Sequence, residues 1–120
     1  MLTAMPIDGC TRVVGVFGDP VEHTLSPPMQ NRAFVAMGLP YVYVPWHVLA
    51  QRLADAVSAI RALGLAGVNV TIPHKVAVMG LLDELTPEAR LIGAVNTIEN
   101  RDGWLVGHNT DGPGFLRSLT

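Results

Sequence analysis

The sequence predicts an α/β fold in three layers: a mainly parallel mixed sheet flanked by helices on both faces, with a C-terminal β-hairpin. Two observations support this prediction. Short apolar runs alternate along the chain with segments of helical periodicity, an order typical of parallel sheets that are covered on both faces. Near the end of the chain, two strand-like segments flank the turn Asn100-Arg101-Asp102-Gly103, which indicates a hairpin and hence an antiparallel element.

The first part of the chain predicts strand, helix and strand. The apolar run 13–17 is typical of a strand buried on both faces. Ser26 followed by Pro27 predicts a helix start, because a serine side chain can cap the first turn and proline is tolerated there. The helix should extend to Met37, with apolar residues at helical spacing at Met29, Ala33, Ala36 and Met37. Residues 41–44 return as a strand.

The second part of the chain contains the clearest helical periodicity. One face of that helix carries Leu49, Leu53, Ala56, Val57, Ile60 and Leu63, a pattern typical of an amphipathic helix. A third strand is predicted over 68–72, followed by short helical pieces over 75–82 and 86–92. Strands over 94–99 and 104–108 should form the hairpin.

Composition excludes several classes of protein. The chain has 120 residues, 49% of them hydrophobic and 15% charged, and a net charge of −2; this predicts one folded domain. No apolar run approaches the roughly 20 residues of a membrane span, and residues 1–10 do not resemble a signal peptide, so a cytoplasmic location is expected. Seven scattered arginines make nucleic acid an unsuitable partner. Cys10 is the only cysteine, which excludes an internal disulfide and a Cys-x-x-Cys site.

Polar residues follow the first predicted strand. Ligands of open α/β sheets bind beyond the carboxyl ends of the strands, and His23-Thr24-Leu25-Ser26 lies there, at the start of a helix. Free amides and the helix dipole favour an anion such as a carboxylate, to which the hydroxyls of Thr24 and Ser26 would add two donors. The alternative is that Ser26 is only a helix cap.

A second polar cluster lies at the end of the third predicted strand. Asn69 and Thr71 share one face of an otherwise apolar segment, and buried amides and hydroxyls are costly unless hydrogen-bonded. His74 and Lys75 follow, and Lys75 is the only lysine of the chain. The alternatives are that Asn69 serves a neighbouring loop, that His74 is a packing or surface residue, and that Lys75 is solvated.

Two further clusters belong to the hairpin. Asn96 and Thr97 lie within the fourth predicted strand, and Asn109-Thr110-Asp111-Gly112 follows the fifth, where it also fits a simple turn and cap. All four clusters should converge on one edge of the sheet. Together they offer an anion site, amides for hydroxyls, one lysine and one acid, an inventory that suits a small polyhydroxylated carboxylic acid.

Four motifs contain these residues. They are Gly-Asp-Pro-Val-Glu-His-Thr-Leu-Ser-Pro (18–27), Asn-Val-Thr-Ile-Pro-His-Lys (69–75), Gly-Ala-Val-Asn-Thr (93–97) and Gly-His-Asn-Thr-Asp-Gly (107–112). In this order and spacing they resemble the substrate domain of shikimate dehydrogenases, over nearly the whole chain.

The resemblance implies a role for each matching residue. The implied substrate-binding residues are Thr24 and Ser26 for the carboxylate, Thr71, Asn96 and Asp111 for ring hydroxyls, and Lys75. Lys75, paired with Asp111, would also be catalytic. An ammonium group can stabilise and protonate the alkoxide-like oxygen that forms when a ketone accepts a hydride.

The chain departs from the family pattern in two places. The usual Ser-x-Ser of the first motif is Thr24-Leu25-Ser26 here, which leaves the preference between shikimate and quinate open. Relatives continue into a strand and a glycine-rich dinucleotide loop, for which Gly112-Pro113-Gly114 is no substitute, because the third glycine of G-x-G-x-x-G would fall on Arg117. We expect residues 1–120 to form the substrate domain, without an NADP site and without the family's nucleotide-binding domain.

The favoured interpretation is the substrate-binding and proton-transfer half of an NADP-dependent shikimate dehydrogenase of aromatic amino-acid biosynthesis, inactive alone. Its expected partners are shikimate or 3-dehydroshikimate and the nucleotide-binding domain. One alternative is a stand-alone binding module for shikimate-like acids. Another is part of an enzyme that acts on quinate or an amino analogue.

Overall fold

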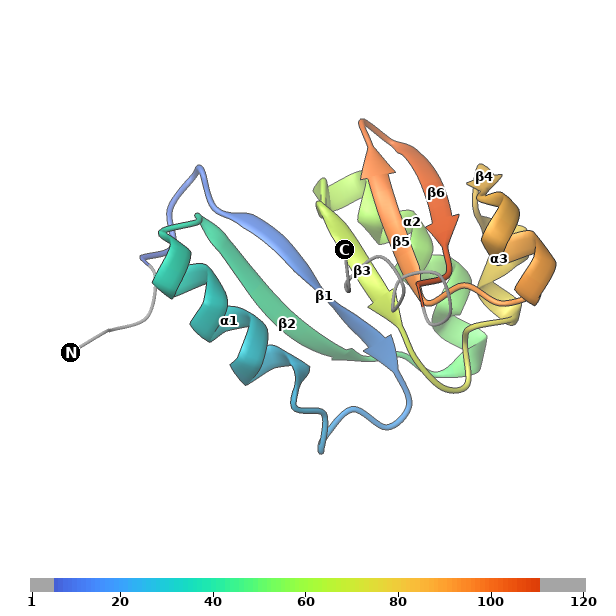
Figure 1. Ribbon diagram of the computed structural model, residues 1–120, viewed down its shortest axis with the longest axis horizontal. Helices are drawn as coiled ribbons and strands as arrows, with labels where there is room; N and C mark the ends of the chain where they lie inside the picture. Colours follow the sequence, from blue (N-terminus) through green and yellow to red (C-terminus); the bar gives the residue numbers. More distant parts are fainter. Residues whose placement is uncertain (1–5, 111–120) are drawn as a thin grey trace.

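The computed structural model describes residues 6–110, which form one sheet with helices on its two faces (Figure 1). The strands are β1 (Arg12–Gly18), β2 (Tyr41–His47), β3 (Gly67–Val70), β4 (Glu84–Leu85), β5 (Thr97–Arg101) and β6 (Trp104–His108). The α-helices are α1 (Ser26–Met37), α2 (Leu53–Leu63) and α3 (Pro87–Ile92), and short 3₁₀ helices are η1 (Ala50–Arg52) and η2 (Ala77–Leu81).

The sheet is mixed, with the strand order β2-β1-β3-β5-β6-β4. β1 pairs in parallel with β2 and β3, and β4 pairs in parallel with β6. β5 is antiparallel to both β3 and β6. The turn of the β5–β6 hairpin has positive φ at Asp102 (51°) and Gly103 (94°), as expected for a two-residue turn that matches the twist of the strands. The predicted α/β class and its hairpin are confirmed.

The main apolar core lies between the sheet and α2. Leu53, Val57 and Ile60 of α2 are buried against Val68 of β3 and Ile98 of β5. The predicted apolar face of α2 is therefore confirmed at its centre. It fails at its ends, where Leu49 and Leu63 are 42% and 72% exposed. Leu49 precedes η1 and lies outside α2, and Leu63 is the last residue of α2.

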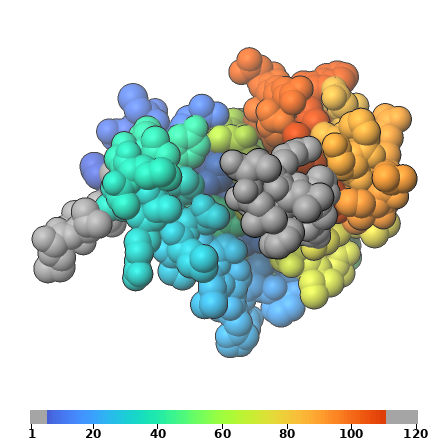
Figure 2. All heavy atoms as spheres, viewed as in Figure 1, coloured from blue at the N-terminus to red at the C-terminus, as the bar shows by residue number. Residues whose placement is uncertain are grey.

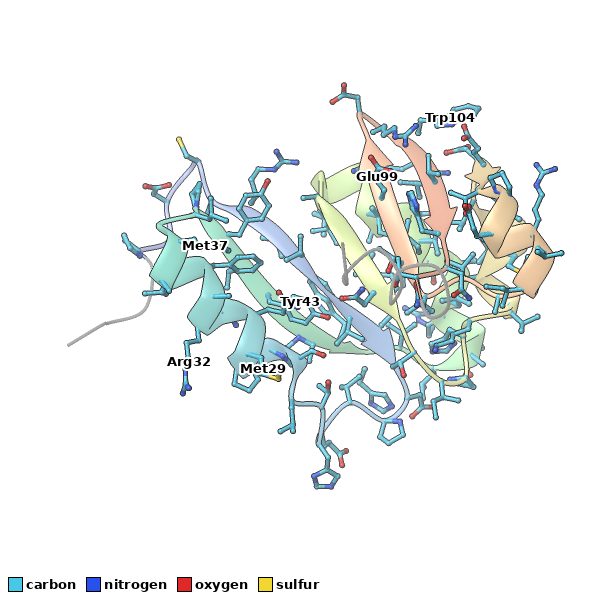
Figure 3. All side chains as sticks on the ribbon, viewed as in Figure 1. Met29, Arg32, Met37, Tyr43, Glu99 and Trp104 are labelled. Carbon is cyan, nitrogen blue, oxygen red and sulfur yellow. The ribbon has the colours of Figure 1, made fainter. Side chains whose placement is uncertain are left out.

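The predicted helix α1 is confirmed over Ser26–Met37, but its apolar residues do not form a buried face. Met29 and Met37, labelled in Figure 3, are 67% and 63% exposed. The partly buried side of α1 instead carries Asn31 and Phe34. The reason is the position of the helix: α1 packs on β2, at the edge of the sheet, and not on a complete face. In the space-filling view the atoms of α1 gather at one side, apart from the hairpin and α3 (Figure 2).

Several predicted boundaries are corrected by the structure. The second strand extends to His47 instead of Val44, and the third ends at Val70 instead of Ile72. The helical piece predicted over 75–82 is the shorter η2, and the strand predicted over 94–99 begins only at Thr97. The two-residue strand β4 was not predicted, because it is too short to show any periodicity. Within residues 6–110 no helix has the length and apolar character to cross a bilayer.

Candidate functional site

A cavity of about 370 Å³ lies beyond the ends of β1 and β3, beside the start of α1. Its polar lining residues are His23, Thr24, Ser26, Tyr43, Asn69 and Thr71. A volume of this size is at the lower end of the range for small-molecule sites. The structure therefore brings together three of the predicted site residues, Thr24, Ser26 and Thr71, although they come from two separate motifs.

Gly18 allows the two strand ends to approach each other at this cavity. A Cβ atom at Gly18 would lie 2.4 Å from Cγ2 of Thr71 and 3.1 Å from Cγ1 of Val21. The amide of Thr71 donates to the Phe17 carbonyl at 3.0 Å, and the amide of Asp19 donates to the Ile72 carbonyl at 3.1 Å. Thr71 is thus held against the end of β1, where its side chain forms part of the cavity wall.

The start of α1 presents hydroxyls and not amides. The N-cap residue is Leu25, without a side-chain cap, so the interpretation of Ser26 as the cap is wrong. The expected free amides are also missing, because Pro27 and Pro28 have no N–H and the amide of Met29 donates to the Leu25 carbonyl. An anion here would depend on side-chain hydroxyls.

Thr24 is arranged to donate its hydroxyl hydrogen. Its Oγ1 accepts a hydrogen bond from the amide of Ser26 at 3.3 Å. Because that contact uses a lone pair, the single hydroxyl hydrogen of Thr24 stays available to a ligand in the cavity.

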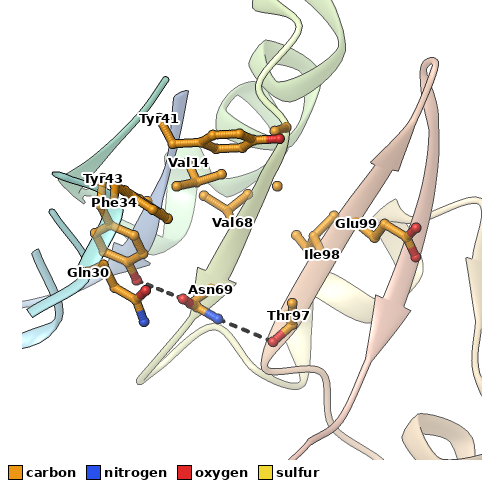
Figure 4. A pocket seen from close by; sticks show the side chains of 13 residues that line it. Val14, Gln30, Phe34, Tyr41, Tyr43, Val68, Asn69, Thr97, Ile98 and Glu99 are labelled. Carbon is orange, nitrogen blue, oxygen red and sulfur yellow. Dashed lines mark hydrogen bonds between the residues drawn. The ribbon is translucent and has the colours of Figure 1, made fainter. Parts of the chain in front are cut away.

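A chain of hydrogen bonds connects the cavity to the hairpin (Figure 4). Tyr43 Oη donates to Asn69 Oδ1 at 2.7 Å, and Asn69 Nδ2 donates to Thr97 Oγ1 at 3.2 Å. Thr97 Oγ1 donates to Asn96 Oδ1 at 3.1 Å, and the amide of Thr110 donates to the same oxygen at 3.1 Å. Asn96, one of the predicted site residues, is buried. The side chains of Thr97 and Asn69 link it to the cavity.

Tyr43 stands between two cavities. It lines the site cavity and a second one of about 400 Å³ on the face of the sheet, among Phe34, Tyr41 and Val68 (Figure 4). Burial raises the pKa of the Tyr43 phenol, and this effect outweighs a side-chain hydrogen bond from Ser26, which lowers the pKa. The phenol therefore remains protonated near neutral pH and acts as a hydrogen-bond donor.

The backbone of Lys75 is hydrogen-bonded to the residue that precedes Asn96. Its carbonyl accepts from the amide of Val95 at 2.8 Å, next to Asn96 in the chain. His74 is buried, and its Nε2 donates to the Val48 carbonyl, so the packing interpretation of His74 is confirmed. The predicted residue Asp111 lies outside the described residues.

Two features of the site had no part in the sequence prediction. The sequence analysis assigned Tyr43 only to a strand. A tyrosine in a buried strand indicates a hydrogen-bonding site nearby, because its hydroxyl needs a partner. Asp19 and His47 form an exposed pair at the ends of β1 and β2, with 2.7 Å between Oδ1 and Nε2. No local pattern relates these two residues, because 28 positions of sequence separate them.

Residues 16–98 match the family model described as the shikimate dehydrogenase substrate binding domain. This chain belongs to that family. The NADP(+) shikimate dehydrogenase of Geobacter metallireducens is 59% identical over 115 residues, which are 96% of this chain and 40% of the relative. The chain thus spans about two fifths of the length of such relatives.

Solved structures show the same domain. Shikimate 5-dehydrogenase from Listeria monocytogenes, in complex with shikimate and NAD, aligns with a TM-score of 0.89 and 47% identity over 94% of this chain and 39% of the other. The 5-ketofructose reductase of a Gluconobacter strain aligns with a TM-score of 0.88 and 42% identity over 93% of this chain and 40% of the other. Solved structures similar to this chain are therefore named for more than one substrate.

Proposed function

We propose that this chain is the substrate-binding and proton-transfer half of an NADP-dependent shikimate dehydrogenase. The complete protein would reduce 3-dehydroshikimate with NADPH to shikimate, in cytoplasmic chorismate and aromatic amino-acid biosynthesis. Residues 1–120 would be its substrate domain, and a separate nucleotide-binding domain its partner. The observation that carries the proposal is the 370 Å³ cavity, which is lined by the two hydroxyl residues Thr24 and Ser26 at the start of α1, by Asn69 of β3 and by Thr71 just after β3.

The carboxylate of the substrate would lie against Thr24 and Ser26. Thr24 has its hydroxyl hydrogen to donate, because its oxygen already accepts from the amide of Ser26. The prolines that follow Ser26 remove backbone donors, so the two hydroxyls are the groups of this turn that would select a carboxylate. Hydrogen bonds from neutral donors to a charged group contribute about 1.5–3 kcal/mol.

The ring hydroxyls would lie toward Thr71, Asn96, Lys75 and Asp111. Thr71 lines the cavity, and Asn96 joins it through Thr97 and Asn69. When a ketone carbon is reduced, negative charge develops on its oxygen, and the ammonium of Lys75 would stabilise and protonate that oxygen. Asp111 would orient the lysine and bind a hydroxyl.

The residues that the structure describes do not fit a dinucleotide. Its pyrophosphate needs a glycine-rich turn between a strand and a helix. The turn from β1 to α1 contains Asp19, Pro20 and Glu22, two of them acids that would repel a phosphate. The turns that lead from β2 into η1 and from β3 into η2 contain no glycine. NADP would therefore be held by the partner domain.

Two substitutions at Thr24 test the proposal in the full-length protein. Thr24→Val keeps the shape but removes the hydroxyl donor, so the Kd for shikimate should rise by roughly 10- to 100-fold. Thr24→Ser keeps the hydroxyl and should bind nearly as tightly as the parent. Calorimetric titration with shikimate measures both, and an unchanged Kd for Thr24→Val would reject the carboxylate assignment.

The likeness to 5-ketofructose reductase supplies a competing substrate. That substrate is a sugar ketone without a carboxylate, so a carboxylate-binding pair at Thr24 and Ser26 would give it no advantage. Turnover of shikimate, quinate and 5-ketofructose by the full-length protein should favour shikimate. Preference for 5-ketofructose would overturn the proposed substrate, and preference for quinate would revise it.

A further inference from the structure

The described sheet has two edges, and β2 forms the longer one. The strand order places β2 at one end of the sheet and β4 at the other. β4 has only two residues, whereas β2 has seven. An edge strand presents backbone N–H and C=O groups with which a strand of another molecule can pair. β2 is therefore the edge at which a further strand would be added.

The backbone groups of alternate residues of β2 point away from β1. At one end of the strand the Pro40 carbonyl accepts from the amide of Arg12 at 2.8 Å. At the other end the amide of Val48 donates to the Gly18 carbonyl at 2.9 Å. Arg12 and Gly18 are the first and last residues of β1. Since the backbone groups of successive residues alternate between the two sides of a strand, the even-numbered residues of β2 face β1. The outward positions are Tyr41, Tyr43, Pro45 and His47.

Three of these four positions have no amide hydrogen to offer to another strand. The amide of Tyr41 already donates to the carbonyl two residues earlier, at 2.9 Å. The amide of Tyr43 donates to Oδ1 of Asn31, and Pro45 has no amide hydrogen. The remaining position, His47, is the last residue of the strand. A strand laid along β2 would therefore meet hardly any donors.

Asn31 takes the place that a neighbouring strand would occupy. In an antiparallel pair, two facing residues can exchange both of their backbone hydrogen bonds. Asn31 makes the same exchange with Tyr43: its Nδ2 donates to the carbonyl at 2.9 Å, and its Oδ1 accepts from the amide at 2.7 Å. The side chain comes from α1, which lies alongside β2 (Figure 1). Both backbone groups at the centre of the edge are thus in use.

We propose that Asn31 and Pro45 close the β2 edge against pairing with the β2 strand of a second copy of this chain. Asn31 occupies the backbone groups at the centre of the strand, and Pro45 removes the next outward donor. A second copy is the relevant partner, because two identical edges can pair about a twofold axis. The inference does not depend on the proposed function, since self-association is measured without substrate.

Opening both positions in the full-length protein tests the inference. Asn31→Ala frees the backbone groups of Tyr43, and Pro45→Val restores an outward amide in a residue type that strands favour. Sedimentation velocity at rising protein concentration measures self-association. The dimer Kd of the double variant should be lower than that of the parent by roughly 10-fold or more, because several backbone hydrogen bonds would form across the new pair. Each single variant should fall between the two.

Two control variants separate edge pairing from a loss of stability. Asn100→Ala removes side-chain hydrogen bonds to two carbonyls and one amide. It lies in β5, with β1 and β3 between it and β2, so it should lower the free energy of unfolding and still associate like the parent. Pro40→Val adds an amide on the side of the chain that faces β1 and should also associate like the parent.

Hydrogen exchange locates the contact. In the double variant the amides of residues 43–47 should exchange more slowly as the protein concentration rises, which aggregation of unfolded protein would not produce at this strand. If the double variant does not fold, Pro45→Val alone decides, through the concentration dependence of exchange at its new amide.

Three results would overturn the inference. One is a folded double variant that associates no more than the parent. Another is association without slower exchange over residues 43–47. The third is slower exchange of these amides with concentration in the parent itself, because the edge would then already be open.

Discussion

Asn31 connects the position of α1 to the geometry of the site. Its Nδ2 donates to the Tyr43 carbonyl at 2.9 Å, and its Oδ1 accepts from the Tyr43 amide at 2.7 Å. β2 is an edge strand, so these two backbone groups have no neighbouring strand and the Asn31 side chain takes its place. The same pair of bonds holds α1 against β2, and Ser26 of α1 and Tyr43 of β2 line the same cavity.

Asn31→Ala should destabilise the chain measurably. Loss of two neutral hydrogen bonds should lower the free energy of unfolding by about 1–3 kcal/mol. The better helix propensity of alanine offsets about 0.6 kcal/mol of this loss. Tyr43 is 5% exposed, so water reaches the freed groups poorly and the net loss should lie near 2 kcal/mol. With an unfolding slope of about 2 kcal/mol per molar urea, the midpoint should fall by about 1 M.

Urea unfolding followed by circular dichroism measures this loss. Gln30→Ala is the control, because Gln30 is the neighbouring residue of α1 and is exposed. Asn31→Asp should fall between the two, since a carboxylate can accept from the Tyr43 amide but cannot donate to its carbonyl. If Asn31→Ala unfolds at the same urea concentration as Gln30→Ala, the side chain does not hold α1 to the edge strand.

Three further predictions concern other parts of the chain. Gly18→Ala should raise the Kd for shikimate, because the new Cβ would lie 2.4 Å from a methyl group of the cavity wall. An unchanged Kd in calorimetry would contradict this. In the full-length protein Lys75→Ala should lower kcat by orders of magnitude with little change in KM, and combining it with Asp111→Asn should cost much less than the product of the single defects; purely multiplicative defects would assign Lys75 to the solvent. The hydrogen bond from Arg61 lowers the pKa of Asp83. The stability that this carboxylate contributes is therefore present above its unfolded-state pKa and is lost as pH falls through the lower folded-state pKa. Arg61→Ala should reduce this loss of stability at acid pH when the free energy of unfolding is measured against pH, and an unchanged pH dependence would refute the assignment.

The order of elements was predictable because it depends on local patterns. The periodicity of α2 and the alternation of strands and helices are properties of neighbouring residues, and the structure confirms both. The apolar face of α1 was not predictable in this way. Met29 and Met37 have helical spacing, yet they are exposed, because α1 attaches to the edge of β2 through the polar side chain of Asn31. An apolar stripe predicts burial only where the helix covers a sheet face.

The convergence of the polar motifs was predictable in part. The rule that strand ends hold the ligands places Thr24, Ser26 and Thr71 at one cavity, and the structure agrees. The rule says nothing about amides, and Pro27 and Pro28 remove those that the helix start would otherwise offer. The general property of helix N-termini therefore does not hold at a helix whose first turn contains two prolines.

The direction of the hydrogen bonds could not be predicted from the sequence. Asn, Thr and Tyr side chains can each donate or accept, so an inventory of residue types leaves every bond undetermined. The ambiguity is removed by Thr110, whose amide reaches Asn96 only after β6 has paired with β5 and returned the chain to the site edge. One donor without an alternative then fixes Asn96, Thr97, Asn69 and Tyr43 in turn. The donors and acceptors of the side chains from Asn96 to Tyr43, which lines the cavity, therefore follow from a backbone amide at the end of the hairpin.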